Sequence, residues 1–347
     1  MLVELKNHLA EGCPTTEDFL RSEGLKYHFA GFPGTPVYVV VSYITDKQID
    51  FLKSLPTVAK ITQIGTSYQL ASKKWKASGT VVKVKNLEVG GNYPVLIAGP
   101  CAVESEEQLY TIASFLAKKG IRFLRGGAYK PRTSPYSFQG LKKSGLEIMR
   151  KVADEFDMMA VTELLDLSAL DEVSQYADIL QVGTRNMHNY HLLRALGKQK
   201  LPVLLKRGFS ATVEEWLLAA EHILLGGNDM VILCERGIRT FEPATRNTLD
   251  LSAVALAKQL SHLPVIVDPS QGTGDSRLIT PLSLAAMAVG ADGLMVETHN
   301  DPSHALSDGQ QSLNFGQFEE LLTGLRKISQ LDSRPFDFDS KSVKFTS

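Results

Sequence analysis

The feature that most constrains the fold is a repeat of short apolar runs, which alternate with helical patterns from residue 94 onward. Eight such runs occur, and they read VLIAGP, FLRGGAY, MMAVTELL, DILQVG, PVLLKRG, MVILCERG, PVIVDPS and DGLMVE. Between them lie segments with helical periodicity, such as 105–120, 212–227 and 248–261, which open on Ser or Thr. Eight β/α units in about 250 residues predict a closed (β/α)8 TIM barrel. A doubly wound open sheet carries the same repeat and remains the alternative.

The first 72 residues have a different pattern, in which two helical segments interrupt four strand-like runs. The segments in order are 1–7 (strand), 15–24 (helix), 25–31 and 37–43 (strands), 46–56 (helix) and 58–65 (strand). This βαββαβ order is typical of a small α+β ferredoxin-like domain. We therefore divide the chain into a ferredoxin-like domain at 1–72, a linker and hairpin at 73–93, the barrel at 94–330 and a C-terminal tail at 331–347.

Composition excludes several classes of partner. The net charge is -1 over 347 residues, so no global field attracts nucleic acid or an anionic membrane, and any basic site must be a local cluster. The apolar runs are shorter than the ~20 residues that span a bilayer. Cysteines 13, 101 and 234 are odd in number and far apart, and no signal-like start precedes them. We expect a cytoplasmic protein without nucleic-acid or membrane partners.

Reactive side chains concentrate where the predicted strands end, which is the active face of a TIM barrel. They are Cys101, Glu104, Arg125, Lys130, Arg132, Glu163, Arg185, Asn186, Lys206, Arg207, Glu235, Arg236, Asp268, Gln271, Glu297 and His299. A single Arg beyond a strand is more often a surface residue. Cations that follow strands two, four, five and six, with Arg277 beyond strand seven, instead predict one rim that binds more than one polyanion.

A metal site is a second possibility at this rim. Cys101, Glu297 and Asp308 come from three separate loops, and their mixed soft and hard donors would admit several divalent ions. The alternative for Cys101 is a small buried packing residue. Ligands scattered over about 200 residues do not form a motif as specific as CxxC.

Several long strings resemble one known family. LIAGPCAVES, RGGAYKPRTSPYSFQGL, VGTRN, LLKRG, ILCERGIRTFEPATRNTLD, VIVDPS and ALSDGQQSL are similar to 3-deoxy-D-arabino-heptulosonate 7-phosphate (DAHP) synthases of the short type, which carry an N-terminal ferredoxin-like (ACT-like) regulatory domain. The related octulosonate phosphate synthases carry an extra residue inside the segment equivalent to KPRTS, which favours the heptulosonate branch. The resemblance implies a transferase that condenses phosphoenolpyruvate (PEP) with erythrose 4-phosphate and water, the first step of the shikimate pathway.

The resemblance also implies roles for individual residues. PEP would be bound by Arg125, Lys130, Arg185, Lys206 and Arg236. Arg132 and Thr133 would bind the phosphate of the aldose. A divalent ion, Mn²⁺ or similar, would be bound by Cys101, Gln271, Glu297 and Asp308. The residues expected to take part in catalysis are Lys130, Cys101 and Glu297.

Gln271 departs from the family pattern, in which a histidine ligand follows the DPS triplet. Its amide oxygen is a neutral, hard donor that suits Mn²⁺ or Mg²⁺. The following GTGDSR also lacks a pair of arginines found in close relatives. Three alternatives stay open: a working DAHP synthase, a synthase for another aldose phosphate, and a non-catalytic PEP-binding paralogue. His299 could either approach the metal or hydrogen-bond substrate or a carboxylate.

The N-terminal domain carries a separate expectation. By resemblance it would bind an aromatic amino acid, tyrosine or phenylalanine, and close over the barrel mouth as a population shift between open and closed arrangements. The alternative is that the domain only enlarges the oligomer. The resemblance implies a homotetramer.

Overall fold

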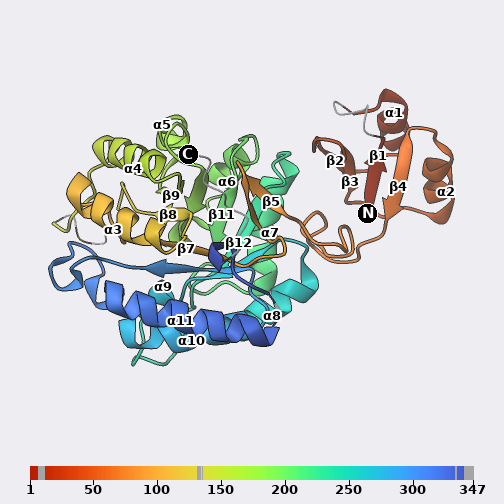
Figure 1. Ribbon diagram of the computed structural model, residues 1–347. Helices are drawn as coiled ribbons and strands as arrows, with labels where there is room; N and C mark the ends of the chain where they lie inside the picture. Colours follow the sequence, from red (N-terminus) through yellow and green to blue (C-terminus); the bar gives the residue numbers. More distant parts are fainter. Residues whose placement is uncertain (7–11, 131–133, 135, 333, 340–347) are drawn as a thin grey trace.

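The barrel is closed. This computed structural model describes residues 1–6, 12–130, 134, 136–332 and 334–339. Eight parallel strands pair in chain order, and the last pairs with the first, so the predicted TIM barrel is confirmed and the open-sheet alternative is wrong (Figure 1). The strands are β7 (Val95–Gly99), β8 (Phe123–Arg125), β9 (Met159–Leu164), β10 (Ile179–Val182), β11 (Val203–Lys206), β12 (Val231–Glu235), β13 (Val265–Val267) and β14 (Gly293–Glu297).

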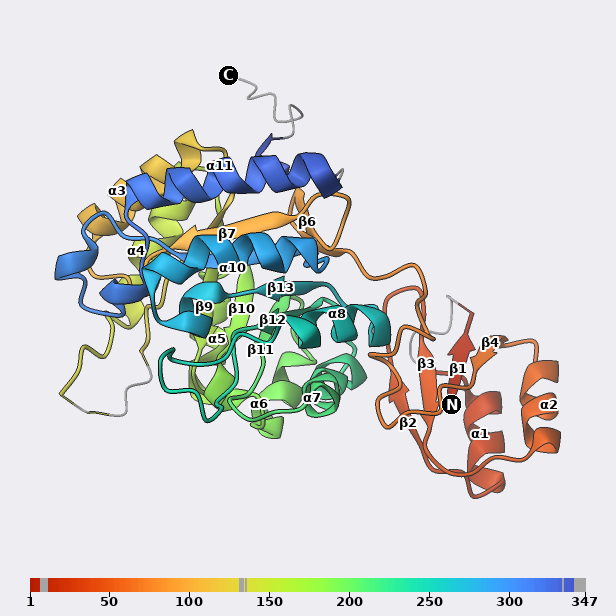
Figure 2. The same cartoon turned by 90° about the horizontal axis from the view of Figure 1, so that it is seen from below.

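Helices surround the strands, as Figure 2 shows for α10 and α11 beside β7. They are α3 (Glu106–Lys118), α4 (Lys143–Glu155), α5 (Leu170–Ser174), α6 (Tyr190–Leu196), α7 (Val213–Leu225), α8 (Leu251–Leu260), α9 (Pro269–Thr273), α10 (Ser276–Ala288) and α11 (Phe315–Asp332). Two of the three predicted start signals are used, whereas α8 is capped by Asp250 instead of Thr248. Ser105 accepts a hydrogen bond from the N–H of Gln108, and Thr212 forms a reciprocal capping box with Glu215.

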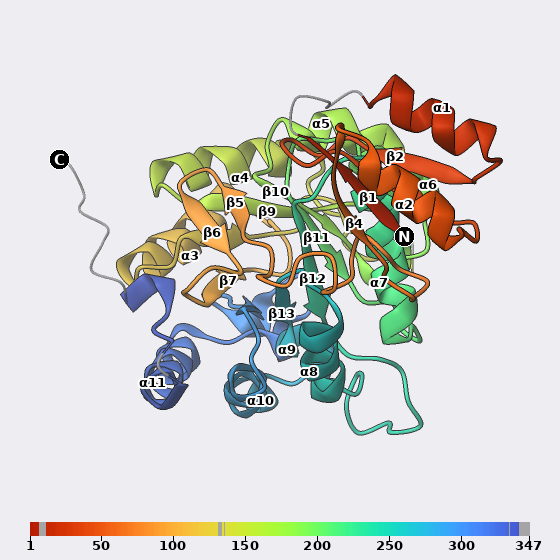
Figure 3. The same ribbon diagram turned by 90° about the vertical axis from the view of Figure 1, so that its right-hand side faces the viewer.

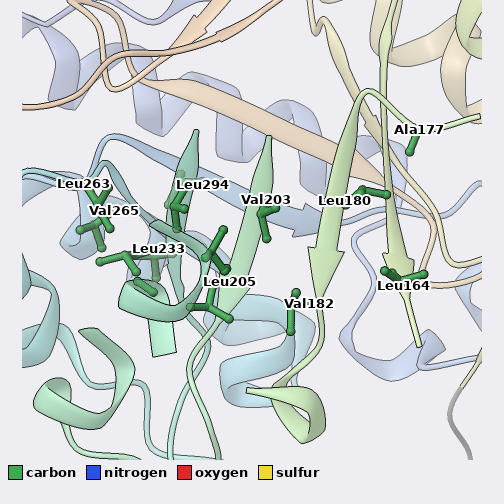
Figure 4. Close-up of a cluster of buried hydrophobic side chains, with 14 of the residues drawn as sticks. Leu164, Ala177, Leu180, Val182, Val203, Leu205, Leu233, Leu263, Val265 and Leu294 are labelled. Atoms are coloured by element: carbon green, nitrogen blue, oxygen red, sulfur yellow. The ribbon is translucent and has the colours of Figure 1, made fainter. Parts of the chain in front are cut away.

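Strand alternation divides the barrel core into two layers. Residues that point outward pack against the helices, and Figure 4 labels several of them on β9 to β14, including Leu180, Leu205 and Leu294. Their neighbours point inward and form a second apolar cluster, which contains Phe123, Val161, Ile179, Leu204, Ile232, Cys234, Ile266 and Met295. Both layers are buried, which explains why the strands read as continuous apolar runs in the sequence.

A short hairpin closes the end of the barrel at which the strands begin. Strands β5 (Val82–Val84) and β6 (Leu87–Val89) pair antiparallel. Val82, Val84 and Val89 belong to the inner apolar cluster, next to Val95 at the start of β7. The barrel is therefore a packed core that opens only where the strands end.

The N-terminal domain lies beside the barrel, and Figure 3 looks at it with α1 and α2 toward the viewer. Its elements are β1 (Leu2–Leu5), α1 (Pro14–Ser22), β2 (Tyr27–Ala30), β3 (Val37–Val40), α2 (Asp46–Ser54) and β4 (Val58–Thr62). The strands form an antiparallel sheet in the order β2-β3-β1-β4, so the predicted βαββαβ pattern is confirmed. One sheet face packs on the two helices, and the other belongs to the cluster that includes the linker and barrel.

Residues 69–71, just before the predicted linker, are anchored to the barrel by the side chains of Glu221 and His262. Glu221 on α7 accepts hydrogen bonds from the backbone N–H groups of Gln69, Leu70 and Ala71 at 3.0, 2.7 and 2.9 Å. The Nε2 atom of His262 lies 2.6 Å from the carbonyl oxygen of Leu70. Leu70 and Ala71 are fully buried, so the end of the predicted N-terminal domain is integral to the barrel surface.

The described part of the predicted tail is packed. Phe336 is fully buried, and the N–H of Asp337 donates to the carbonyl oxygen of Pro94 at 3.2 Å, beside the start of β7. Burial raises the pKa of the Asp337 carboxyl to about 7. Among the helices of the described ranges, none is long and apolar enough to cross a membrane.

Candidate active site

The strand register places a ring of polar side chains directly above the inner apolar layer. On seven strands, the residue two positions after an inward apolar residue also points inward. These residues are Arg125, Glu163, Gln181, Lys206, Arg236, Asp268 and Glu297. On β7 the equivalent position is Gly99, where an added Cβ would lie 2.1 Å from the carbonyl oxygen of Arg125. Alternation and a close backbone contact together define the floor of the site.

A cavity of about 370 Å³ lies above this ring, at the ends of the strands. Its cationic lining residues are Arg125, Lys130, Arg185, Lys206, Arg236 and Arg246. Its other lining residues are Ser134, Ser137, Glu163, Gln181, Gly183, Thr184, Phe209, Gln271 and Asp308. All five cations predicted to bind PEP therefore reach one cavity. The volume falls in the range of small-molecule sites, and the excess of cations suits an anionic ligand.

Two of the five cations predicted to bind PEP are already paired with carboxylates. Arg125 Nη1 donates to Glu297 Oε1 at 3.0 Å, and Lys206 Nζ donates to Asp268. Burial, the largest single influence, would lower the pKa of Arg125, but the surrounding negative groups, of which Glu297 contributes most, together outweigh it and raise the pKa. The Nε atom of Arg125 is buried and has no hydrogen-bond partner within the described residues. An unpaired buried donor is costly unless a ligand satisfies it.

Arg185 and Arg236 have no carboxylate partner in the ion pairs of the described chain. Arg236 donates instead to the carbonyl oxygens of Gly237 and Gln271 at 3.2 and 3.1 Å. Its burial lowers its pKa. A buried guanidinium without a counter-ion stores an unfavourable charge that an anionic substrate would neutralise.

Phe209, just beyond β11, holds these cations around one ring. The guanidinium carbons of Arg185, Arg236 and Arg239 lie 5.5, 5.0 and 4.5 Å from the ring centroid. The negative face of an aromatic ring attracts cations within about 6 Å. Phe209 therefore offsets part of the repulsion between neighbouring guanidinium groups.

The predicted metal ligands also come together. Donor atoms of Cys101, Glu297 and Asp308 all lie within 4.8 Å of one another. Cys101 Sγ lies 3.0 Å from Ser307 Oγ and 3.3 Å from Asp308 Oδ2. Burial, followed by the Glu297 charge, raises the pKa of the Cys101 thiol. Burial would also raise the pKa of Asp308, but Arg246 and the hydrogen bond from Cys101 outweigh it and lower that pKa.

Gln271, on α9, lies among these ligands. Its Nε2 donates to Glu297 Oε1 at 2.7 Å and to Asp308 Oδ2 at 3.2 Å. Two ligands at about 2.2 Å from one ion are at most about 4.4 Å apart, so the three donors are close to coordination distance. One thiolate, two carboxylates and a carboxamide oxygen form a set of mixed softness. The residues present therefore fit a divalent ion, provided that the Gln271 amide turns its oxygen inward.

Lys130 connects the metal-ligand cluster with the cation cluster. Its Nζ donates to the carbonyl oxygen of Cys101 at 2.9 Å and to Cys101 Sγ at 3.1 Å. It also lines the cavity. Arg132 and Thr133, the predicted aldose-phosphate residues in the same loop, lie outside the described residues.

His299 does not join the metal-ligand cluster. Its Nδ1 accepts a hydrogen bond from the N–H of Asp301 at 3.0 Å, and its Nε2 lies 3.6 Å from Glu104 Oε2. Strand β14 ends at Glu297, so regular alternation does not continue to position 299. The structure favours a carboxylate neighbour for His299 over a metal ion.

Other strand-end predictions need correction. Arg207 and Glu235 directly neighbour inward residues and therefore point outward, where Arg207 Nη1 donates to Glu235 at 2.8 Å and to Asp250 at 3.0 Å. Arg277 pairs with Asp275, and its side chain is 84% exposed, so it is a surface residue. Asn186 donates to the carbonyl oxygen of Leu165 at 2.8 Å, which is a structural contact.

Sequence reasoning missed several residues at the site, among them Phe209, Arg246 and Gln311. Arg246 Nη1 donates to Gln311 Oε1 at 2.7 Å, and Gln311 Nε2 donates to Glu297 Oε2 at 2.6 Å. Arg246 and Gln311 lie within ILCERGIRTFEPATRNTLD and ALSDGQQSL, two of the strings that resemble the DAHP synthases, and that resemblance is the signal that could have identified them.

Comparison with known proteins matches this chain to one family model and to named enzymes. Residues 72–332 match the DAHP synthetase I family. The chain is 49% identical over 308 residues, 89% of both chains, to phospho-2-dehydro-3-deoxyheptonate aldolase of Thermotoga maritima. It is 32% identical over 269 residues to a 2-dehydro-3-deoxyphosphooctonate aldolase of Syntrophotalea carbinolica, which covers 72% of this chain and 96% of that one.

Two solved structures also match this chain. The crystal structure of the Thermotoga maritima DAHP synthase covers 97% of this chain and 99% of that one, at 44% identity and a TM-score of 0.78. A truncated form of the same organism's enzyme covers 78% of this chain and 100% of that one, at 47% identity and a TM-score of 0.74. The similarity includes the barrel and, in the longer structure, nearly all of the remaining chain. The protein belongs to the DAHP synthetase I family.

Proposed function

We propose that the protein condenses PEP with erythrose 4-phosphate and water to give DAHP and phosphate. The observation that carries this proposal is the convergence of six cationic side chains on one cavity of about 370 Å³, beside a cluster of metal-ligand residues. Both substrates of this reaction are phosphorylated, and they must be held together against their mutual repulsion. The higher identity to the heptonate enzyme than to the octonate enzymes supports the four-carbon acceptor.

Binding of PEP is assigned to the cationic side chains that line the cavity. Arg185 and Arg236 lack carboxylate partners in the described structure, so they are the side chains with most to gain from a phosphate or carboxylate. Arg125, through its unpaired Nε, and Lys206 would complete the set from below. Guanidinium groups present paired donors that match carboxylate and phosphate oxygens.

The aldose phosphate is assigned to the loop after β8. Arg132 and Thr133 are the proposed ligands, and Ser134 and Ser137 of the same loop line the cavity. Lys130 lies between this loop and Cys101. We assign Lys130 to the oxygen of the acceptor aldehyde, where its Nζ would donate to the negative charge that develops as C3 of PEP attacks.

Cys101, Gln271, Glu297 and Asp308 are the proposed ligands of a divalent metal, which the family generally uses. A bound ion would supply Lewis-acid polarisation of the acceptor aldehyde. Gln271 is proposed to offer its amide oxygen, which selects harder ions such as Mn²⁺ over the ions that imidazole prefers.

An assay of PEP-dependent phosphate release tests the activity. Purified full-length protein with Mn²⁺ should release phosphate with erythrose 4-phosphate and should be much less active with five-carbon aldose phosphates. Activity with only the five-carbon acceptors would replace the proposal by the repurposed synthase. PEP binding without release from any aldose phosphate would favour the non-catalytic paralogue.

Residues 1–72 are proposed to regulate the barrel by binding tyrosine or phenylalanine. Close packing of the second sheet face against the linker and barrel supports a path for such coupling. A truncation that begins at Thr66 should keep catalysis and lose sensitivity to the amino acid. A matched truncation that begins at Lys76 should also lose stability, because it removes the backbone donors of the half-buried Glu221 carboxylate.

Inhibition that persists in the form starting at Thr66 would contradict the regulatory role and leave the catalytic proposal intact. The two truncations also test the proposed boundary near residue 72. The homotetramer and the cytoplasmic location remain predictions, which sedimentation and fractionation would check.

A further inference from the structure

Gln311 holds a buried carboxamide whose two ends are both bonded. It ends the short 3-10 helix Gly309–Gln311 and is fully buried. Its Oε1 accepts from Arg246 Nη1 at 2.7 Å, and its Nε2 donates to Glu297 Oε2 at 2.6 Å. A guanidinium can only donate hydrogen bonds. Arg246 therefore fixes which end of the amide is the oxygen, and the N–H end must face the carboxylates.

Arg246 is itself held in place by the end of α9. Its backbone N–H donates to the carbonyl oxygen of Thr273 at 2.9 Å. Gly274 has a positive φ of 72°, and an added Cβ there would lie 2.7 Å from the Cβ of Arg246. The guanidinium also lies 3.5 Å from Asp308 Oδ2. Arg246 thus joins the end of α9 to Asp308 and Gln311.

Gln271 provides the contrast within the same cluster. Its Nε2 also donates to Glu297 and Asp308. Within the described part of the chain, however, no hydrogen bond reaches its Oε1, whereas Arg246 locks the Oε1 of Gln311. The Gln271 amide can therefore reverse to present its oxygen, and the Gln311 amide cannot.

We propose that Arg246 and Gln311 are positioning residues that orient the Glu297 and Asp308 carboxylates for a divalent ion. The Gln311 N–H occupies Glu297 Oε2, while Glu297 Oε1 accepts from Arg125 and Gln271, so both oxygens of this carboxylate are held beside Cys101 and Asp308. Arg246 sets the Gln311 amide and balances the charge of Asp308. This inference rests on the metal site of the proposed function and extends it to two residues that would not touch the ion. Partners of this kind typically change metal affinity by about 10- to 100-fold.

The test is a titration of the purified full chain with Mn²⁺ alone, in which free Mn²⁺ is measured by electron paramagnetic resonance. Arg246→Met and Gln311→Met should each weaken Mn²⁺ affinity by roughly 10- to 100-fold. The double variant should bind Mn²⁺ no more weakly than the weaker-binding single variant. Both changes break the same relay, the hydrogen bonds that run from Arg246 through Gln311 to Glu297. Arg277→Met is the matched control, since Arg277 is an exposed arginine on the neighbouring helix, and it should bind Mn²⁺ like the wild type.

The outcomes separate this inference from the function on which it rests. If the wild type binds no Mn²⁺, the proposed metal site fails and the relay fails with it. If the wild type binds Mn²⁺ but Arg246→Met binds equally well, or if the two single effects multiply in the double variant, only the relay is overturned. Gln311 is buried, so its variant can misfold. In that case the Mn²⁺ affinity of Arg246→Met, compared with that of Arg277→Met, is sufficient to test the relay.

Discussion

The two ends of the barrel use the same inward-facing strand positions in opposite ways. Where the strands begin, the inward residues are apolar, and the valines of the β5–β6 hairpin pack against them. The charges near that end are paired: Asp178 binds Lys85 and Arg150, each at 2.7 Å. Where the strands end, most inward residues are charged, and Arg185 and Arg236 lack carboxylate partners among the described residues. One end is packed and charge-paired, and the other carries positive charge that no carboxylate of the described chain balances.

The difference has an energetic meaning. Burying an unpaired charge disfavours folding, whereas the packed hairpin favours it. A protein departs from good local packing and pairing mainly at its functional site and offsets that loss elsewhere. Substitutions at the open end should therefore change binding and catalysis, and substitutions at the closed end should change stability.

The largest expected effect is at the open end, from Lys130→Met. Loss of Nζ next to Cys101 and the cavity should lower kcat/KM by roughly 100-fold or more, about 3 kcal/mol of transition-state stabilisation. Steady-state phosphate release measures it. Lys85→Met at the closed end is the matched control and should retain kcat/KM. Equal losses in both variants would erase the distinction between the two ends.

Arg185→Met should affect binding without affecting folding. Its guanidinium lines the cavity and lies over Phe209, so the affinity for PEP should fall by about 2 kcal/mol, roughly 30-fold. Because the residue is exposed and unpaired within the described chain, the free energy of unfolding should change by less than about 0.5 kcal/mol. Calorimetry with PEP and denaturant unfolding measure the two quantities. A large stability loss with normal PEP affinity would contradict the assignment.

Asp178→Asn should destabilise the closed end in a pH-dependent way. Burial would raise the pKa of Asp178, but hydrogen bonds from Arg150 and Lys85 outweigh it and lower the pKa. A lowered folded-state pKa gives stability that is present above the unfolded value, about 3.9, and is lost as the pH falls through the folded value. At pH 7 the variant should lose about 2 kcal/mol. Denaturant unfolding should show this difference shrinking below pH 4, and a difference that grows there would be wrong in sign.

The smallest effect is expected from Val84→Ala in the hairpin. Val84 is buried in the inner cluster, and loss of two methyl groups should cost about 1.5 kcal/mol of unfolding free energy. The KM for PEP should stay within a factor of two. A raised KM with unchanged stability would mean that the closed end shapes the site directly.

The fold could be predicted from sequence because its signals are local. The apolar runs and the helix caps each act within a few residues, and the structure has the caps Ser105 and Thr212 where the pattern placed them. The strand-end cations were also predictable, but Lys206 and Arg207 could be told apart only by the alternation that turns one inward and the other toward Glu235. A count of strand-end cations that ignores this two-residue alternation therefore includes outward-facing side chains such as Arg207.

The rest depends on contacts between distant loops. Arg246 and Gln311 are 65 residues apart, and neither shows a pattern that would join them. His299 follows the end of β14, where backbone geometry rather than period decides its direction. Gln271 could be identified as a departure from its family, but its two hydrogen bonds to carboxylates required coordinates.

A crystal structure of the wild-type protein soaked with PEP tests the central claim most directly. The account predicts that PEP occupies the cavity at the strand ends, with its phosphate and carboxylate oxygens within hydrogen-bond distance of Arg185, Lys206 and Arg236. PEP bound elsewhere, or an empty cavity at a PEP concentration that saturates the enzyme, would contradict it.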